Sequence, residues 1–451
     1  MVDAARPAKP PRVSRSIRRL SFWVFPVLAV ISAWQIWDAI EARRLEAELA
    51  RVFPDGLETR PRSSSEPPPA EDAAAYYAAA NLAAISADRI ARLHWQAAQP
   101  TPFQLVSRLR TAVAAQKPPA PEDVSLAERL MSIYALPLRL LDHASSLPYV
   151  KVSDANVEMA LTMTGLISTG AIAGAQTLGW IRRRDAERAV ASLVVRVKAQ
   201  RAYDAEGSWF AAFTKARELS DVVVDVGMLL SQTTPSEASL VRLDEALAAA
   251  YGDDDLATLV QSEIRRPVAN LEAIGSGRRV TVGVRGVFVR PALRRMSVVG
   301  MRTASEVMAA AQLPWPERLH AVDRLQDRRS RVVSGIASAF VWQPIPGGWS
   351  IARPARTFAP ILGSTLAGIS SARVAIAVER YRRTQGSIPE GVDALGLAAA
   401  DYMDPFTGAP LRYLRSDEGY AIYSIGENLK DDAGDFTGAR DVGVRVRGPI
   451  P

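Results

Sequence analysis

The chain has 451 residues and contains no cysteine, so several classes of site are excluded at once. Without thiols there is no disulfide scaffold, thiolate zinc site, iron–sulfur cluster or cysteine nucleophile. Histidine is also scarce, and three residues leave little room for a His-rich metal centre. Each histidine lies in sequence typical of a helix, so we interpret them as ordinary surface or capping residues: His94, His143 and His320.

Short catalytic motifs are missing as well. The chain has no G-x-x-x-x-G-K-[ST] phosphate loop, no G-x-S-x-G elbow and no H-E-x-x-H helix. Paired carboxylates need a set separation in space, so sequence alone does not single out a pair among 48 acidic residues. We therefore favour a non-enzymatic role without a small-molecule cofactor. The alternative is a hydrolase that uses carboxylates in a cleft of a helical body.

The net charge of +7 is concentrated at the N-terminus. Residues 1–20 hold six basic residues and one acid, a net charge of +5, and residues 21–37 hold no charged residue. The remaining residues, 38–451, therefore carry only +2. The high pI therefore comes mainly from the N-terminal tail, where basic residues indicate how the chain is oriented in a membrane. The rest of the chain is nearly neutral, so nucleic acid is not an expected partner.

The apolar run Leu20–Trp37 predicts a transmembrane anchor. About 18 helical residues at 1.5 Å each nearly cross a hydrocarbon core of roughly 30 Å. Trp23, Trp34 and Trp37 lie near its ends, as interfacial rings do, and the basic tail places residues 1–19 in the cytoplasm. We expect a single-pass protein of the bacterial inner membrane with a periplasmic body. A cleavable signal peptide and a buried soluble helix are the alternatives.

Residues 38–70 predict a juxtamembrane helix followed by the Pro/Ser linker Arg60–Ala70. From residue 71 to 355 helical patterns dominate, and the class expected is an irregular α-helical body. Its clearest helix start is Thr234-Pro-Ser-Glu237, with Thr234 as N-cap and Glu237 completing a capping box. Asp253–Asp255 lacks calcium-loop spacing and is interpreted as the acidic start of a further helix.

Two segments of the body leave alternatives open. Ala160–Trp180 is uncharged and long enough for a second span, but its hydroxyls and glycines favour a helix buried in the body. Ile264–Arg331 holds 14 arginines against five acids. These arginines either bind an anionic lipid or nucleic acid or pair with acidic faces elsewhere in the chain, which we favour. Within this segment Val280–Arg290 alternates like a strand or hairpin.

A small α+β module is predicted at the C-terminus, over residues 356–440, with residues 441–451 as a tail. Its helix, Ala372–Arg383, carries apolar residues on two faces, which suggests burial on more than one side. A short helix over Val392–Leu397 follows it. Two strands, Leu411–Leu414 and Tyr420–Ile425, are joined by a hairpin turn at Ser416–Gly419. An acidic loop, Gly426–Asp435, comes after the second strand.

The motifs DPFTGAPLRY and GYAIYSIG in this order resemble the globular tail of the major pseudopilin of type II secretion. The resemblance covers about 65 residues. It rests mainly on Asp404-Pro-Phe406, Gly408, Pro410, Tyr413 and Tyr423-Ser-Ile-Gly426. It implies a long helix packed on a small antiparallel sheet. The chain lacks a prepilin cleavage motif, and more than 300 residues separate its apolar run from the module. It therefore looks like an envelope protein with an appended pseudopilin-like module, associated with a secretion or pilus-like apparatus and with envelope protein partners.

The same resemblance implies calcium in the loop that follows the last predicted strand. Calcium takes six to eight hard oxygen ligands, and four side chains there could supply some of them: Ser424, Asp431, Asp432 and Asp435. Lys430 beside these acids counts against a metal, and a solvated acidic turn is the alternative.

Overall fold

The computed structural model describes residues 15–53, 71–93, 100–148, 150, 164–251, 256–264, 283–325, 352–436 and 441–448. It is 74% helical, with a small three-stranded antiparallel sheet at the C-terminus. This confirms the predicted mainly α class with a small C-terminal α+β part. The chain forms two compact units, one of residues 1–59, 264–305 and 328–350 and the other of the remaining residues.

In the first unit, α1 (Arg15–Val52) is joined to α13 (Gly283–Ala311) by a ladder of ion pairs. Arg294 lies 2.7 Å from Asp38, and Arg302 lies 2.7 Å from Glu48. Arg295 contacts Glu41 at 3.7 Å. The last two pairs share an offset of 254 residues, and partner numbers rise together, so the two helices run parallel.

The acidic side of this ladder follows a coiled-coil spacing along α1. Its buried residues recur three and four apart: Asp38, Glu41, Leu45, Glu48 and Val52. Such spacing keeps one seam of a helix facing its partner. Arginines of the Arg-rich segment thus pair with acids of the chain itself, as favoured above for this segment.

The predicted strand Val280–Arg290 is wrong for the part that the structure describes, because residues 283–290 belong to helix α13. Strand propensity depends on packing and is readily overridden. Here Arg290 and Arg294 both contact Asp38, and a helix places residues four apart on one face to do so.

The second unit contains the helical body. Its helices are α2 (Ala74–Leu93), α3 (Pro102–Ala114), α4 (Pro121–Ile133), α5 (Ala135–Ser146), α7 (Thr164–Arg182), α8 (Ala186–Ala199), α9 (Arg201–Glu206), α10 (Trp209–Gln232), α11 (Glu237–Ala248), α14 (Trp315–Asp323) and α16 (Ala352–Gln385). Residues 256–264 are helical too. Polar caps begin several helices. At α3, for example, Thr101 and Gln104 form a complete capping box, with Pro102 in the first turn.

The start of α11 lies two residues later than predicted. Ser236, not Thr234, is the N-cap, and its hydroxyl accepts a hydrogen bond from the Ser239 amide. Glu187 of α8 accepts a bond from the Ser236 amide at 2.8 Å and contacts the Ser239 hydroxyl. A carboxylate from another helix thus does what Glu237 was expected to do. Asp253–Asp255 lies outside the described residues, and residues 256–264, which follow it, are helical.

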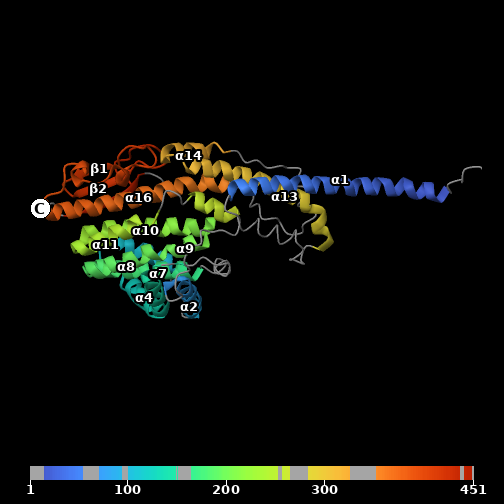
Figure 1. Cartoon of the computed structure of the whole chain (residues 1–451). Helices are drawn as coiled ribbons and strands as arrows, with labels where there is room; N and C mark the ends of the chain where they lie inside the picture. Colours follow the sequence, from blue (N-terminus) through green and yellow to red (C-terminus); the bar gives the residue numbers. More distant parts are fainter. Residues whose placement is uncertain are drawn as a thin grey trace, which may run out of the picture. The chain divides into compact units, whose positions relative to one another are not determined.

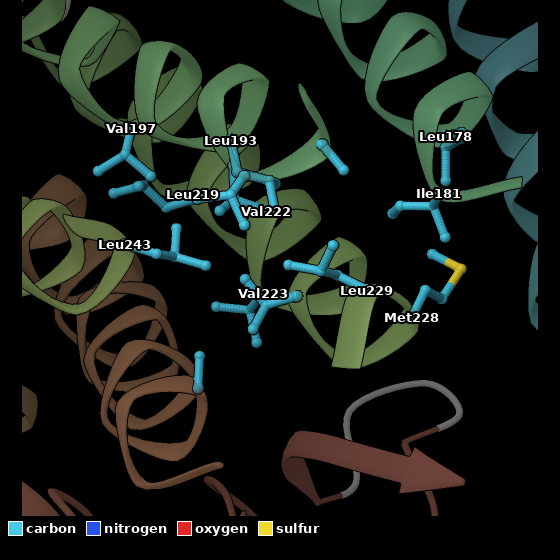
Figure 2. Close-up of a cluster of buried hydrophobic side chains, with 14 of the residues drawn as sticks. Leu178, Ile181, Leu193, Val197, Leu219, Val222, Val223, Met228, Leu229 and Leu243 are labelled. Atoms are coloured by element: carbon cyan, nitrogen blue, oxygen red, sulfur yellow. The ribbon is translucent and has the colours of Figure 1, made fainter. Parts of the chain in front are cut away.

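Helix α7 lies in the core of the helical body, as favoured for Ala160–Trp180. Its buried residues include Leu166, Ile172, Leu178 and Ile181, and it contacts α2, α3, α8 and α10. Figure 2 shows how side chains from α7, α8, α10 and α11 meet in this core. Residues 160–163 lie outside the described part of the chain.

The C-terminal sheet lies beside α16 (Figure 1) and also packs against α10 through its last strand. It has the order β1 (Arg412–Ser416), β2 (Gly419–Ser424) and β3 (Val442–Arg447), all antiparallel. The hairpin between β1 and β2 is the predicted one, closed by Ser416 opposite Gly419. Strand β3 was missed, because its residues were assigned to the tail 441–451. Its buried Val444 and Val446 alternate with exposed arginines.

Helix α16 is buried on two sides, as the mixed apolar faces predicted. Val374, Ile376 and Val378 are all fully buried. The helix contacts α10 and α11 as well as β2 and β3. It starts at Ala352, twenty residues before the predicted start. Its segment Arg353–Gln385 is long and apolar enough to cross a membrane, but most of it is buried in the protein, as in a core helix.

Candidate functional site

The most unusual polar feature of the helical body is a row of acids on one face of α10. Glu218, Asp221 and Asp225 are spaced three and four apart, so they project from the same side of the helix. Glu218 and Asp225 are buried, at 4% and 0% exposure. Buried carboxylates are costly unless they are paired, so their partners decide what this face does.

Asp225 is paired with arginines from two other helices. Arg110 of α3 donates from Nε to Asp225 Oδ1 at 2.9 Å, and Arg196 of α8 donates from Nη1 to Oδ2 at 2.6 Å. Arg110 also donates to Asp221 at 2.9 Å. Desolvation opposes the charge of Arg110, but the carboxylates outweigh it and raise its pKa. This network ties α3, α8 and α10 together through charge-assisted bonds.

Glu218 has no ion-pair partner among the described residues and instead lines a small cavity. The cavity measures about 20 Å³ and is lined by residues of α5, α7, α8, α9 and α10. Four buried polar residues converge on it: Arg196, Gln200, Tyr203 and Glu218. Among the described residues, Arg196 Nε and Gln200 Oε1 have no hydrogen-bond partner.

Burial raises the pKa of Glu218 to about 7, and the nearby positive charge of Arg196 offsets only part of that rise. Asp221 raises it further, while Arg217 and Arg110 lower it. Burial also raises the pKa of Tyr203 well above its ordinary value. The site therefore holds a carboxyl group that changes its charge near neutral pH inside a protein core.

The size of the cavity limits its chemistry. A cavity needs about 10–15 Å³ to hold one water molecule, and unpaired donors and acceptors are what such a water binds. The Glu218 cavity has room and partners for about one water. It offers no space for a hydrolysable substrate, so it gives the hydrolase alternative no support.

The predicted calcium ligands do not all lie together. Ser424 is fully buried, and its hydroxyl donates to Asp404 Oδ1 at 2.7 Å. Asp431 instead accepts a bond from the Tyr423 hydroxyl at 3.0 Å. Successive side chains of a strand point to opposite faces, so Ser424 and Asp431 lie on opposite sides of β2.

Asp432 lies near the residue that precedes β3. Its amide donates to Asp441 Oδ1, and the Gly434 amide donates to Asp441 Oδ2 at 2.6 Å. Burial raises the pKa of Asp441. Asp435 is half-buried, and its amide donates to the Asp432 carbonyl. In the described part of the chain, no three His, Asp or Glu side chains form a group that could hold a metal ion.

Ser424 and Asp431 thus do not fit one calcium site, and calcium binding by the loop carboxylates stays a prediction. The residues that organise this region are Asp404 and Asp441, which the sequence-based ligand set omitted. Asp404 accepts bonds from the Ser424 hydroxyl and from the Phe406 amide. The motif Asp404-Pro-Phe406 therefore closes a turn onto the end of β2.

Neither of the two described histidines lines the Glu218 cavity. His143 is exposed at the end of α5 and its ring contacts Tyr76 edge-on at 4.4 Å between centroids. His320 is exposed in the last turn of α14. His94 lies outside the described residues. The surface interpretation is therefore confirmed for the two that are described.

Comparison of the chain with protein-family models, with curated proteins and with solved structures finds no match.

Proposed function

We propose that this chain is a membrane-anchored bacterial envelope protein with a non-enzymatic binding or scaffold role. The observation that carries the proposal is the uncovered apolar stretch of α1. Residues 25–33 of this helix are all exposed, including Phe25 at 71% and Val30 at 69%. Soluble proteins rarely leave so continuous an apolar surface open to water, whereas a membrane anchor requires it.

The charges that flank the apolar stretch support an orientation. Residues 1–20 carry a net charge of +5, and basic residues beside an anchor favour the cytoplasmic side. The second unit would then lie in the periplasm. The ladder between α1 and α13 begins at Asp38, directly after the apolar run, so it would stiffen the first turns that leave the membrane.

The C-terminal part supports a scaffold role near a secretion or pilus-like apparatus. A long helix, a turn beginning at Asp404 and an antiparallel sheet follow in the order that the pseudopilin resemblance implies. In this chain, however, α16 and β3 also pack on α10. The proposal is therefore of a pseudopilin-like element built into a larger helical body, where it would present its surface to envelope proteins.

Binding of anionic lipid or nucleic acid through the Arg-rich segment has less support. Four of its arginines contact acids of α1: Arg290, Arg294, Arg295 and Arg302. Charges engaged inside the protein are not available to phosphates unless those pairs break.

Alkaline washing of membranes tests the anchor. We expect the wild-type chain to stay in the membrane pellet. Replacing Val30 and Ile31 together by arginine should release it, since each arginine at a helix centre costs about 2.5–3.5 kcal/mol on insertion scales.

The matched control places the same two arginines at Ala39 and Ile40, which are also exposed on α1 but lie beyond the apolar run. This variant should remain in the pellet. Wild-type protein in the wash, or release of both variants to the same extent, would contradict the anchor.

A further inference from the structure

A second cavity, separate from the Glu218 site, lies between α3, α4 and α7. It has a volume of about 200 Å³. Most of its walls are apolar: Leu109 and Val113 come from α3, Val124 and Met131 from α4, and Leu178 from α7. Trp180, Arg182 and Arg183 close the α7 side. A pocket of this volume with mainly apolar walls and a few polar groups at its rim is a candidate site for a small ligand.

Gly179 of α7 lines this cavity. A Cβ atom added there would meet no atom within 4 Å. Glycine inside a helix costs about 1 kcal/mol of stability relative to alanine, and no close approach of another element explains it at this position. Gly165, in the first turn of the same helix, differs: its added Cβ would clash with Asn81 at 2.4 Å. A side chain at position 179 would therefore enter the open space of the cavity without a clash.

The charged side chains that line the cavity carry a net positive charge. Gln176 lies one turn before Trp180 and makes no hydrogen bond with another described residue. Arg182 likewise has no ion-pair partner in the described part of the chain. Arg183 lies 3.7 Å from Glu128, and both of these side chains are about half exposed. Arg183 and Arg188 both stack on the Trp180 ring, at 5.2 Å and 4.8 Å from its centroid.

We propose that this cavity binds a small organic monoanion with an apolar body. The apolar walls would hold the body, while Arg182, Arg183 and the Gln176 amide would bind the carboxylate or a similar head group. A cavity of 150 Å³ holds benzene, so one of this volume suits about eight carbon atoms. Trp180 and Met131 favour an aromatic body, because rings and thioethers pack well on aromatic faces.

Calorimetric titration with 3-phenylpropionate tests the site in the full chain, held in bilayer discs. We expect saturable binding of one molecule per chain. Gly179→Leu should fill the cavity and weaken binding at least tenfold. Titration of the same variant in identical discs measures how much probe partitions into the lipid, and this heat is subtracted from the wild-type signal. The thermal midpoint of this variant should not fall, because the new side chain enters open space and glycine leaves the helix. If the midpoint of Gly179→Leu falls, Val124→Phe takes its place in the test, since it fills the cavity from the α4 side.

The head-group preference is tested with 3-phenylpropanol, the uncharged match. The double variant Arg182→Gln, Arg183→Gln should weaken 3-phenylpropionate about fivefold, as expected for exposed ion pairs, and leave 3-phenylpropanol unchanged. Absence of saturable binding by the wild type, or equal binding by the filled variants, would overturn the site. An equal loss for the acid and the alcohol would overturn its preference for an anion.

Discussion

Arg196 Nη1 of α8 lies 2.6 Å from Asp225 Oδ2 of α10, and these two side chains are 3% and 0% exposed. Arg110 reaches the other oxygen of the same carboxylate at 2.9 Å. One aspartate thus joins three helices at the centre of the body. A buried pair of this kind costs desolvation when it forms, but removing one partner leaves an unpaired charge in the core.

Asp225→Ala should therefore destabilise the chain strongly, by about 3–5 kcal/mol. Asp221→Ala is the matched control, since Asp221 also binds Arg110 but is 32% exposed. The control should cost less than about 1 kcal/mol. Urea unfolding followed by circular dichroism measures both. Equal losses would show that the position of Asp225 between Arg196 and Arg110 is unimportant.

Glu218 predicts a pH dependence of stability. Its pKa is about 7 in the folded protein, against about 4.3 in an unfolded chain. Between these values the folded state binds more protons, so stability falls as pH rises from about 4.5 to 7 and then levels off. Glu218→Gln removes this loss and should be more stable than wild type at pH 8 by up to about 3 kcal/mol.

The measurement is the difference in unfolding free energy between Glu218→Gln and wild type across pH 4 to 8. That difference should grow as the pH rises. A constant difference would mean that Glu218 titrates normally and is not desolvated in the protein core.

Two glycines distinguish close packing from open space. An added Cβ at Gly227 of α10 would lie 3.1 Å from the Arg445 carbonyl of β3, whereas at Gly179 it would meet nothing. Gly227→Ala should cost about 1–3 kcal/mol through overpacking, and Gly179→Ala should gain up to about 1 kcal/mol. Thermal unfolding measures both. If Gly227→Ala were neutral, the contact of α10 with the C-terminal sheet would be looser than the structure describes.

The sequence predicted much of the fold where a local signal agreed with the packing. The hairpin at Ser416–Gly419 and the end of α16 before Gly386 both depend on turn chemistry set by residues adjacent in the sequence. Helix α11 was predicted too, but its cap was misplaced because Glu187 comes from a distant part of the chain. A capping pattern read from four adjacent residues does not include such a partner.

The buried acids were harder to find. Among 48 acidic residues, Glu218 and Asp225 are distinguished by desolvation, which depends on how α3, α8 and α10 pack. A weak signal existed, because Glu218, Asp221 and Asp225 recur three and four residues apart along α10, the spacing of one helix face. The sequence signal for strand β3 was clearer. Val442, Val444 and Val446 alternate with glycine and arginine, which is the two-residue period of a strand.

The ladder of the first unit makes a prediction about register. Glu48→Arg and Arg302→Glu should each destabilise the pairing of α1 with α13, and the double variant should regain at least half of the loss, because the exchanged charges meet again. Combining Glu48→Arg with Arg290→Glu is the control. Arg290 contacts Asp38 and not Glu48, so no recovery is expected. Recovery in the control would contradict the offset of 254 residues between the partners.

As proposed, α1 anchors the chain in the membrane and the helical body lies outside the cytoplasm. A reporter fused after Pro451, active on only one side of the inner membrane, tests this topology most directly. The account predicts periplasmic activity, lost when residues 1–37 are deleted. Cytoplasmic activity of the full-length fusion would contradict the orientation, and with it the proposed envelope role.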